Sequence, residues 1–386
     1  MTNLAYSLRL FLFFGNVLCG EMMRLSWYCL AIAAILLLTG TVSAAGVGEK
    51  WVQTTANAGF SDRAGHTGLA FDDKMWIIGG SSDGGLTGLN DTWHSTDGVH
   101  WVEATPSAEF PGRLDFSTVV FDKKMWIIGG TDGTTALHDV WSSADGIHWI
   151  LNNATPGFNG RYSSAAVAYN NQIWMFGGYD GRFTWDDVWS SADGVTWTMV
   201  NKSAGYGERT GLSALVLDGK MWVTGGLRSS SKIYNDTWYS TDGNTWVQAT
   251  KNAKFAARAG QASTVYDGKM WIIGGFDGIN IRNDVWSSVD GVTWIEATDS
   301  APFSARFDFP VISYNNRIWI IDGATSGTTL ANDTWDSGEG VDDGIWLWLV
   351  LGVGILVVVA AFFIIRKKNV VPEQKSSKKS SKKKNT

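Results

Sequence analysis

The side chains that could carry catalysis are few in this 386-residue chain. Four of its five histidines fall at positions that recur along the chain, not at the spacings that metal ligands require. Both cysteines, Cys19 and Cys29, lie near the N-terminus, so the rest of the chain has no thiol nucleophile and no disulfide. The sequence contains no nucleophile elbow and no phosphate-binding glycine loop. We therefore predict no catalytic residue, no metal site and no cofactor.

Arginine is the other residue type whose spacing suggests a chemical role. Six arginines recur at intervals of 48 to 50 residues: Arg63, Arg113, Arg161, Arg209, Arg258 and Arg306. Two interpretations are open. The arginines form a ring that binds an anion, or each pairs with backbone or a carboxylate within the fold. In either case the even spacing indicates that the elements carrying them are copies of one unit.

The unit is clearest in residues 258–294, RAGQASTVYDGKMWIIGGFDGINIRNDVWSSVDGVTW. Asp267-Gly268 separates two short apolar runs and favours the positive φ angles of a type I′ turn, which predicts a β-hairpin. Gly274-Gly275 is expected to end the second strand, because glycine weakens strand interiors. A variable loop, a third strand and a tight turn at Asp290-Gly291 follow. The four expected strands are 263–266, 270–273, 283–286 and a last strand that carries Trp294.

Six such units in series predict an all-β fold, a six-bladed β-propeller with four antiparallel strands in each blade. Tryptophan supports this prediction, since 18 of the 22 tryptophans fall at three fixed positions of the unit, in its second, third and fourth strands. Aromatic stripes also suit sugar stacking, but regular recurrence within strands favours packing between blades. Each buried indole removes about 150–250 Å² from water, so these side chains are expected to form the core.

The repeated pattern resembles the kelch-repeat family. In this chain MWIIGG, IWMFGG or MWVTGG is followed by NDTW, HDVW, DDVW or NDVW, and the resemblance covers residues 48 to 338. It implies a propeller used mostly as a binding platform, with a minority of enzymes. It also implies that the position two residues after each repeated arginine lies near the mouth of the central channel. Asp115 and Asp308, which occupy this position in two units, and the neighbouring His66 are therefore candidate ligand-binding residues.

The sixth unit lacks a fourth strand of its own. Its glycine pair is replaced by Asp322-Gly323, and no tight turn and tryptophan strand follow Trp335. Residues 48–56, GEKWVQTTA, match the fourth strand of the other units. We predict that this N-terminal strand completes the sixth blade, which removes an open sheet edge.

Strand direction predicts two unlike faces. One, here named the turn face, carries the short first-to-second and third-to-fourth turns. The other, named the loop face, carries the blade entries and the second-to-third loops, which differ in sequence between units. Variable loops on a rigid scaffold are where binding usually occurs. The candidate ligand-binding residues in these loops are Tyr179, Arg182, Phe183, Trp185, Arg228, Phe276 and Arg282. The alternative is that the loop aromatics only cap their blades and that the channel aspartates only satisfy turns.

The N-terminal 45 residues differ from the repeats in composition. Residues 23–45 have a basic residue, an apolar run and then small residues, which predicts a signal peptide within a leader of residues 1–45. A second apolar run precedes it, so Met22 or Met23 is a candidate for the true start.

The C-terminal region predicts a membrane anchor. Residues 345–365 are 21 apolar residues in a row, enough to cross about 30 Å of hydrocarbon as a helix. Arg366-Lys367-Lys368 follow directly, which predicts a cytoplasmic C-terminus. The predicted domains are then a propeller over 46–338 outside the cell, a linker at 339–344, one transmembrane helix and a basic tail at 366–386.

Charge restricts the partners. The tail has nine basic residues and one acidic residue, which suits contact with anionic lipid, whereas residues 46–365 have 20 basic and 35 acidic residues. An acidic outer domain is unsuited to nucleic acid. We therefore predict a monomeric, surface-displayed module of the cell membrane that binds protein or glycan. The alternative is a carbohydrate-active enzyme of the sugar isomerase or lyase type that uses His66, Arg161 or Asp115. A structural component of the cell envelope is the third hypothesis.

Overall fold

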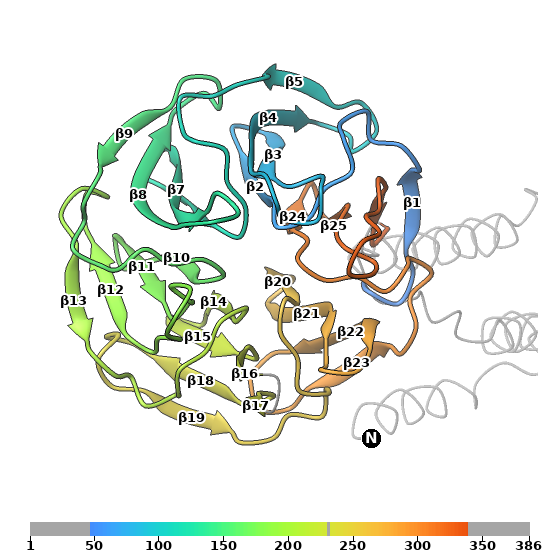
Figure 1. Ribbon diagram of the computed structural model, residues 1–386. Helices are drawn as coiled ribbons and strands as arrows, with labels where there is room; N and C mark the ends of the chain where they lie inside the picture. The colour runs from blue at the N-terminus through green and yellow to red at the C-terminus, as the bar shows by residue number, and fades with distance from the viewer. Residues whose placement is uncertain (1–46, 230–231, 339–386) are drawn as a thin grey trace, which may run out of the picture. The chain divides into compact units, whose positions relative to one another are not determined.

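The computed structural model describes residues 47–229 and 232–338, which form six four-stranded antiparallel sheets arranged as the blades of a propeller (Figure 1). The first strands of neighbouring blades contact one another around the central axis, and the fourth strands lie on the circumference. These described residues contain strands and turns and no helix. The predicted all-β, six-bladed architecture is confirmed.

Strand order within every blade follows the chain, with one exception in the sixth blade. Blades 1 to 3 consist of β2 (Thr67–Phe71), β3 (Lys74–Gly80), β4 (Leu89–Ser95) and β5 (Val102–Thr105); β6 (Ser117–Phe121), β7 (Lys124–Thr131), β8 (Ala136–Ser143) and β9 (Ile150–Asn153); and β10 (Ala165–Tyr169), β11 (Gln172–Phe176), β12 (Val188–Ser191) and β13 (Thr198–Asn201). Blades 4 to 6 consist of β14 (Ser213–Leu217), β15 (Lys220–Thr224), β18 (Thr237–Ser240) and β19 (Val247–Thr250); β20 (Ala262–Tyr266), β21 (Lys269–Phe276), β22 (Ile281–Ser288) and β23 (Ile295–Thr298); and β24 (Val311–Tyr314), β25 (Arg317–Ile321), β26 (Thr334–Asp336) and β1 (Val52–Thr55). A two-stranded hairpin, β16 (Leu227–Ser229) and β17 (Lys232–Ile233), lies in the second-to-third loop of blade 4.

The exception is the closing strand. β1 pairs antiparallel with β26, with Val52 opposite Asp336 and Gln53 opposite Trp335. The N-terminal strand is thus the fourth strand of the last blade. Trp51, immediately before β1, is 7% exposed and packs edge-on against the Phe303 ring, with ring centroids 5.2 Å apart. The segment that precedes blade 1 is therefore held to the last blade by strand pairing and by apolar contacts of Trp51.

The turns explain why the chain reverses where it does. Both central residues of every first-to-second turn have positive φ, as Asp267 (51°) and Gly268 (64°) do in blade 5, which is the type I′ geometry predicted there. The expectation that the glycine pair ends the second strand is wrong in blades 2 and 5, where β7 and β21 continue one residue beyond the pair, whereas β3 of blade 1 ends at Gly80. In blade 5 the pairing shifts register at Gly274 and resumes with Gly275 opposite Arg282, because a glycine at φ 60° forms a bulge in the strand and does not end it.

Blade contacts explain the glycine of the third-to-fourth turns. A Cβ at Gly146 of blade 2 would lie 2.1 Å from the Trp76 indole of blade 1. The same contact recurs around the ring, and Gly48 of the N-terminal segment meets Trp271 in the same way. The tryptophans expected in the fourth strands, such as Trp294, instead lie one residue before them, where four are buried and Trp101 and Trp246 are half-buried. Packing between blades is thus the role of the periodic tryptophans.

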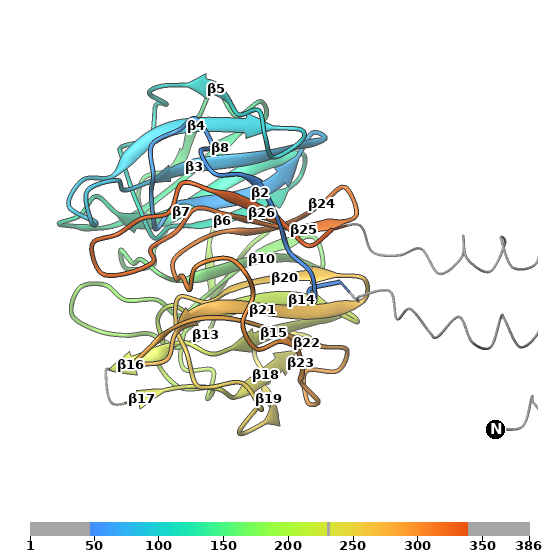
Figure 2. The same cartoon turned by 90° about the vertical axis from the view of Figure 1, so that its right-hand side faces the viewer.

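The two predicted faces are distinct in side view (Figure 2), with the β16–β17 hairpin on one side and the β24–β25 turn on the other. No helix of the described residues is long and apolar enough to cross a membrane. The predicted leader (1–45), linker (339–344), transmembrane helix (345–365) and basic tail (366–386) lie outside the described residues.

Candidate functional site

The six repeated arginines form the inner framework of the blades, not an anion-binding ring. Each is at most 1% exposed, and its guanidinium binds both carboxylate oxygens of one aspartate near the start of its own blade's third strand. The pairs are Arg63–Asp91, Arg113–Asp139, Arg161–Asp187, Arg209–Asp236, Arg258–Asp284 and Arg306–Asp333. Of the two interpretations of these arginines, structural pairing is the one that the geometry supports.

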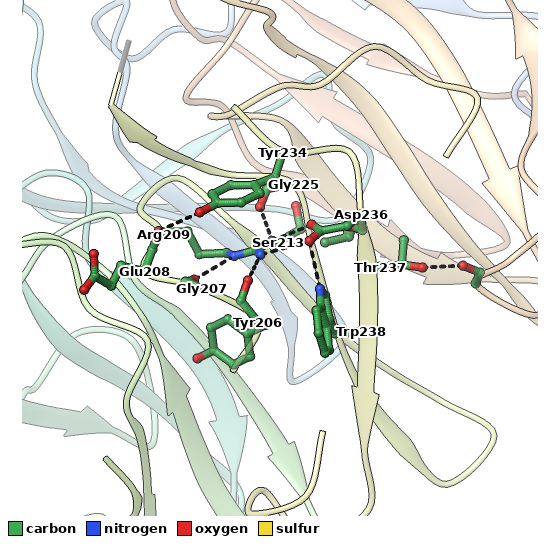
Figure 3. Close-up of polar contacts among 12 residues, drawn as sticks. Tyr206, Gly207, Glu208, Arg209, Ser213, Gly225, Tyr234, Asp236, Thr237 and Trp238 are labelled. Atoms are coloured by element: carbon green, nitrogen blue, oxygen red, sulfur yellow. Dashed lines mark hydrogen bonds and ion pairs between the residues drawn. The ribbon is translucent and has the colours of Figure 1, made fainter. Parts of the chain in front are cut away.

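Blade 4 shows the arrangement in detail (Figure 3). Arg209 donates from Nη1 to the Gly225 carbonyl at 3.0 Å and binds Asp236 through both terminal nitrogens, while Nη2 also donates to the Tyr206 carbonyl. The indole of Trp238 donates to the same carboxylate at 2.8 Å. The ring of Tyr234 covers the guanidinium at 3.9 Å. All the polar groups of this cluster are used internally, and the equivalent Arg161 of blade 3 is likewise unavailable to act as a catalytic group.

A closed ring of hydrogen bonds surrounds the axis two residues after these arginines. Its members are Gly65, Asp115, Ser163, Gly211, Gly260 and Asp308, and all six have positive φ. Each N–H donates to the carbonyl of the member in the preceding blade, over 2.7 to 3.0 Å, and Gly65 donates to Asp308 to complete the circle. We name these six residues the axial ring. Because its backbone groups bond to one another, only its side chains are free to meet a ligand.

The aspartate side chains of the axial ring lean over neighbouring glycines. A Cβ at Gly65 would lie 2.7 Å from Oδ1 of Asp115, and one at Gly260 would lie 2.5 Å from Oδ1 of Asp308. The glycines thus make room for the two carboxylates, which stand on either side of blade 1. The structure brings the predicted residues Asp115 and Asp308 together at the channel.

A cavity of about 390 Å³ opens on the loop face above the axial ring. Loops of blades 1, 2, 3 and 6 form its walls, and Leu114, Phe307 and Leu330 provide apolar surface. A deeper space of about 180 Å³ continues along the channel below the ring. Asp115 and Asp308 line both spaces. We name these spaces the outer and the inner cavity.

His66 and Gln261 line the inner cavity, and both are buried with unused hydrogen-bonding capacity. Neither ring nitrogen of His66 makes a well-aligned hydrogen bond, and Oε1 of Gln261 has no partner. Burial and then the Arg63 guanidinium hold the pKa of His66 well below its usual value, against a smaller opposing effect of the Ile321 backbone. The imidazole is therefore neutral at pH 7.

Burial also acts on the two carboxylates. It raises the pKa of Asp115 to about 6. The pKa of Asp308 lies well above its usual value, because of burial first and the charge of Asp115 second. Side chains in the channel retain some accessible area, but protein surrounds them on all sides, so water screens them poorly. The two groups are a coupled acidic pair that holds a proton near neutral pH.

The predicted loop residues of blade 3 form a separate group. Arg182 lies over the Phe183 ring at 4.9 Å, and both side chains are exposed. Trp185 packs over Arg161 at 5.5 Å and donates to Asp180 at 3.2 Å, so it covers the blade framework. Tyr179 packs edge-on against Tyr162 and donates to the Gly181 carbonyl at 2.8 Å. Arg182 and Phe183 are the members of this group that face solvent.

The remaining candidates lie in blades 4 and 5. Arg228 pairs with Glu208 at 2.7 Å at the surface. Arg282 pairs with Asp277. Phe276 lies 6.5 Å from Phe307, whose ring lines the outer cavity. These residues do not line either cavity, so the structure divides the predicted site into a channel group and a set of loop residues.

Sequence reasoning missed two contributors. Gln261 occupies the same position of the repeat as His66, three residues after the repeated arginine, where the other four blades have Phe, Ser or Leu, and this equivalence is the signal that could have found it. Asp322 replaces the first glycine of the pair, and its Oδ2 accepts the Arg63 N–H at 2.7 Å. In blade 2 the corresponding N–H, that of Arg113, donates to the Leu89 carbonyl. Burial raises the pKa of Asp322 to about 8, against the Arg63 and Gly323 N–H bonds. The departure of the sixth repeat thus supplies an acceptor where the ring closes.

Among the described residues, no group of three or more His, Cys, Asp or Glu side chains is placed to hold a metal ion. The channel is therefore a polar, acidic pocket whose chemistry is that of two carboxylates, an amide oxygen and a neutral imidazole.

Comparisons with known proteins agree with this architecture. Residues 149–323 match the family model described as the KLHDC2/KLHL20/DRC7 Kelch-repeats domain, and residues 69–192 match the DUF6242 beta propeller domain. No curated protein in the comparison matches the chain. With kelch-repeat and β-propeller matches over its repeats and six blades in its structure, the described part of the chain is a kelch-type β-propeller.

Proposed function

We propose that this protein is a membrane-anchored interaction module that displays its propeller at the cell surface and binds a protein partner through the loop face. The observation that carries the proposal is the contrast between the faces. The turn face repeats nearly the same short turns in every blade, whereas the loop face combines the outer cavity with loops that differ in sequence between blades. Variable loops around a cavity on a rigid scaffold are typical of binding surfaces.

The membrane part of the proposal rests on the sequence and on the position of the chain ends. Gly48 occupies the place of the third-to-fourth turn glycines, and Ser337 follows β26 on that same side. Both ends of the propeller therefore leave from the turn face. If residues 345–365 cross the bilayer, the six linker residues reach at most about 20 Å. The loop face would then point away from the membrane.

Single cysteines test this orientation, because the chain has only two natural cysteines, both near the N-terminus. Leu86→Cys on the loop face, Val99→Cys on the turn face and Ser380→Cys in the tail would each be exposed to a membrane-impermeant maleimide on intact cells, in a background without Cys19 and Cys29. We expect fast labelling at position 86, slower labelling at 99 and none at 380 until the cells are permeabilised. Labelling at 380 on intact cells would contradict the topology.

Photocrosslinking tests the binding face. A benzophenone amino acid would replace Phe183 or Ile279 on the loop face, and Val292, which is 51% exposed, on the turn face. We expect the same crosslinked partner from both loop-face positions and none from Val292. A partner captured only from Val292, or equally from all three positions, would refute the assignment of the loop face.

A further inference from the structure

The channel contains acidic and amide acceptor groups. Asp115 and Asp308 contribute carboxylate oxygens to both cavities. In the inner cavity alone, Gln261 adds a free amide oxygen whose identity is fixed by its neighbours, because Nε2 donates to Ser213 Oγ at 3.0 Å and to the Thr224 carbonyl at 3.3 Å. The carbonyl can only accept, so the nitrogen must face it and Oε1 must face away. Gln261 is 7% exposed, and an acceptor buried without a donor is costly.

The charges around the outer cavity have one sign. Among the described residues that line it, the charged ones are Asp115, Asp180 and Asp308, and none is Lys, Arg or His. The nearest repeated arginines are already bound to their own aspartates. Low-dielectric walls strengthen the field of unpaired carboxylates, so the cavity attracts positive charge and repels anions.

From this geometry we infer that the outer cavity binds an organic cation, an ammonium or guanidinium group on an aliphatic chain, with its charge against Asp115 and Asp308. An ammonium offers three donors and a guanidinium five, and neither accepts, which suits the carboxylate oxygens of Asp115 and Asp308 in the outer cavity. Leu114, Phe307 and Leu330 would pack against the aliphatic chain. The volume of about 390 Å³ is in the range of small-ligand sites and much larger than a metal cage.

Two sources could supply this chemistry. One is a free amine, and the other is a Lys or Arg side chain that a partner inserts from the loop face. The second source rests on the proposed function, because it makes the cavity the anchor point of the partner, whereas the first does not. The cation site itself is common to both.

Binding should strengthen as pH rises. A cation needs both carboxylates ionised, and the pKa of Asp115 is raised to about 6 with that of Asp308 also raised, so a proton must leave. The other groups facing the pair are His66, neutral because of its lowered pKa, Tyr162, neutral because of its raised pKa, and Asp180 at the rim. The affinity should therefore increase as pH rises through about 6, the pKa of Asp115, and increase further as Asp308 loses its proton.

The experiment measures binding to the purified full-length chain by calorimetry. The probes are n-butylammonium, the methylamides of Nα-acetyl-lysine and Nα-acetyl-arginine, and heptapeptides with a central Lys. The methylamide of Nα-acetyl-norleucine is the neutral control, and that of Nα-acetyl-glutamate is the anionic control. We expect binding of the cations and none of the controls. In Asp115→Asn and Asp308→Asn we expect at least a tenfold loss of affinity and a flatter pH profile.

Asp299→Asn is the matched variant, because Asp299 is an exposed aspartate that does not line the cavity. It changes net charge equally and should leave the affinity unchanged. Asn keeps the shape of Asp and tolerates the positive φ of the axial ring, so the channel variants are expected to fold, which circular dichroism would check. No cation binding at 10 mM, or equal binding by the Asp299 and Asp115 variants, would overturn the inference.

The two proposals fail separately. Tighter binding of the Lys peptide than of n-butylammonium identifies a partner side chain as the ligand, and the reverse identifies a free amine. Cation binding without any loop-face crosslink would retain the site and reject the interaction module. A loop-face crosslink that Asp115→Asn and Asp308→Asn leave unchanged, with no cation binding, would retain the module and reject the site.

Discussion

Replacing Trp51 with alanine tests whether the N-terminal strand, which completes the last blade, also contributes to the stability of the propeller. The indole is 7% exposed, donates from Nε1 to the Gly48 carbonyl at 3.0 Å and packs against the Phe303 ring. Truncation of a buried Trp to Ala costs about 3–5 kcal/mol through lost burial and the cavity left behind. For a domain of this size that corresponds to a fall in melting temperature of roughly 6–10 °C.

The magnitude has an upper limit set by the topology. β1 is joined covalently to the propeller through one end, so a weakened strand can detach while the other blades stay folded. The loss in Trp51→Ala cannot exceed the free energy of docking this strand. Trp149 of blade 2 is the internal reference, since it is 3% exposed and packs on Phe110 at the same 5.2 Å. Trp149→Ala should therefore show a loss at least as large as that of Trp51→Ala.

Urea unfolding of the full-length chain, followed by far-ultraviolet circular dichroism, measures both losses without relying on tryptophan emission. Val52→Ala is the control on the same strand, because Val52 is 55% exposed and its truncation should change stability by less than about 0.5 kcal/mol. If Trp51→Ala matches Val52→Ala, the closing strand contributes nothing to stability and the reasoning is refuted.

Three other predictions concern buried charge, turn geometry and pH. Arg258→Met leaves the buried carboxylate of Asp284 unpaired and should lower the free energy of unfolding in urea by about 3–5 kcal/mol. Arg282→Ala in the same blade breaks a partly exposed pair with Asp277 and should lower it by at most about 1 kcal/mol. Equal losses would contradict the framework role of Arg258. Gly146→Ala should lower the melting temperature far more than Gly84→Ala, since the first Cβ meets an indole at 2.1 Å and the second meets nothing within 4 Å at a similar φ. The pKa of Asp115 is raised in the folded state to about 6, so the protonated carboxyl group stabilises the folded state. This contribution to the free energy of unfolding is complete below pH 4 and is lost as pH rises through 6. Asp115→Asn should therefore have the same free energy of unfolding as the parent near pH 4 and be more stable than the parent by roughly 2 kcal/mol at pH 7.5. A parent that gains stability relative to the variant between these pH values would contradict this prediction.

Local chemistry explains why the architecture could be predicted from the sequence. Asp267-Gly268 and its equivalents specify the hairpins, and the periodic tryptophans specify which positions face the next blade. These signals act within one repeat or between adjacent repeats, and because they recur in every repeat they can be recognised in the sequence. The glycine pair was misjudged because glycine permits both a strand end and a bulge, and the choice depends on the loop that follows.

The channel could be predicted only in part. Asp115, Asp308 and His66 are indicated by their position in the repeat, and the structure places all three around the axis. Gln261 shares the repeat position of His66 and could have been indicated in the same way, but its vacant acceptor is visible only once the blades are folded. The role of Asp322 is likewise invisible in the sequence, because the N–H that it accepts belongs to Arg63, 259 positions away along the chain. Contacts between the first and the sixth repeats join residues that are distant along the chain, so no local sequence pattern predicts them.

The pairing of β1 with β26 also sets the order in which the protein can fold. Val52 is made among the first residues of the propeller, yet its partner Asp336 follows 284 residues later. At about 5–20 residues per second, synthesis keeps that strand without a partner for roughly 15–60 s. Five blades can form as they emerge, but the last waits for both ends of the repeat region to be present. The edges of the incomplete ring are exposed during that interval. We therefore expect chaperones to bind a nascent chain whose synthesis is stopped after blade 5.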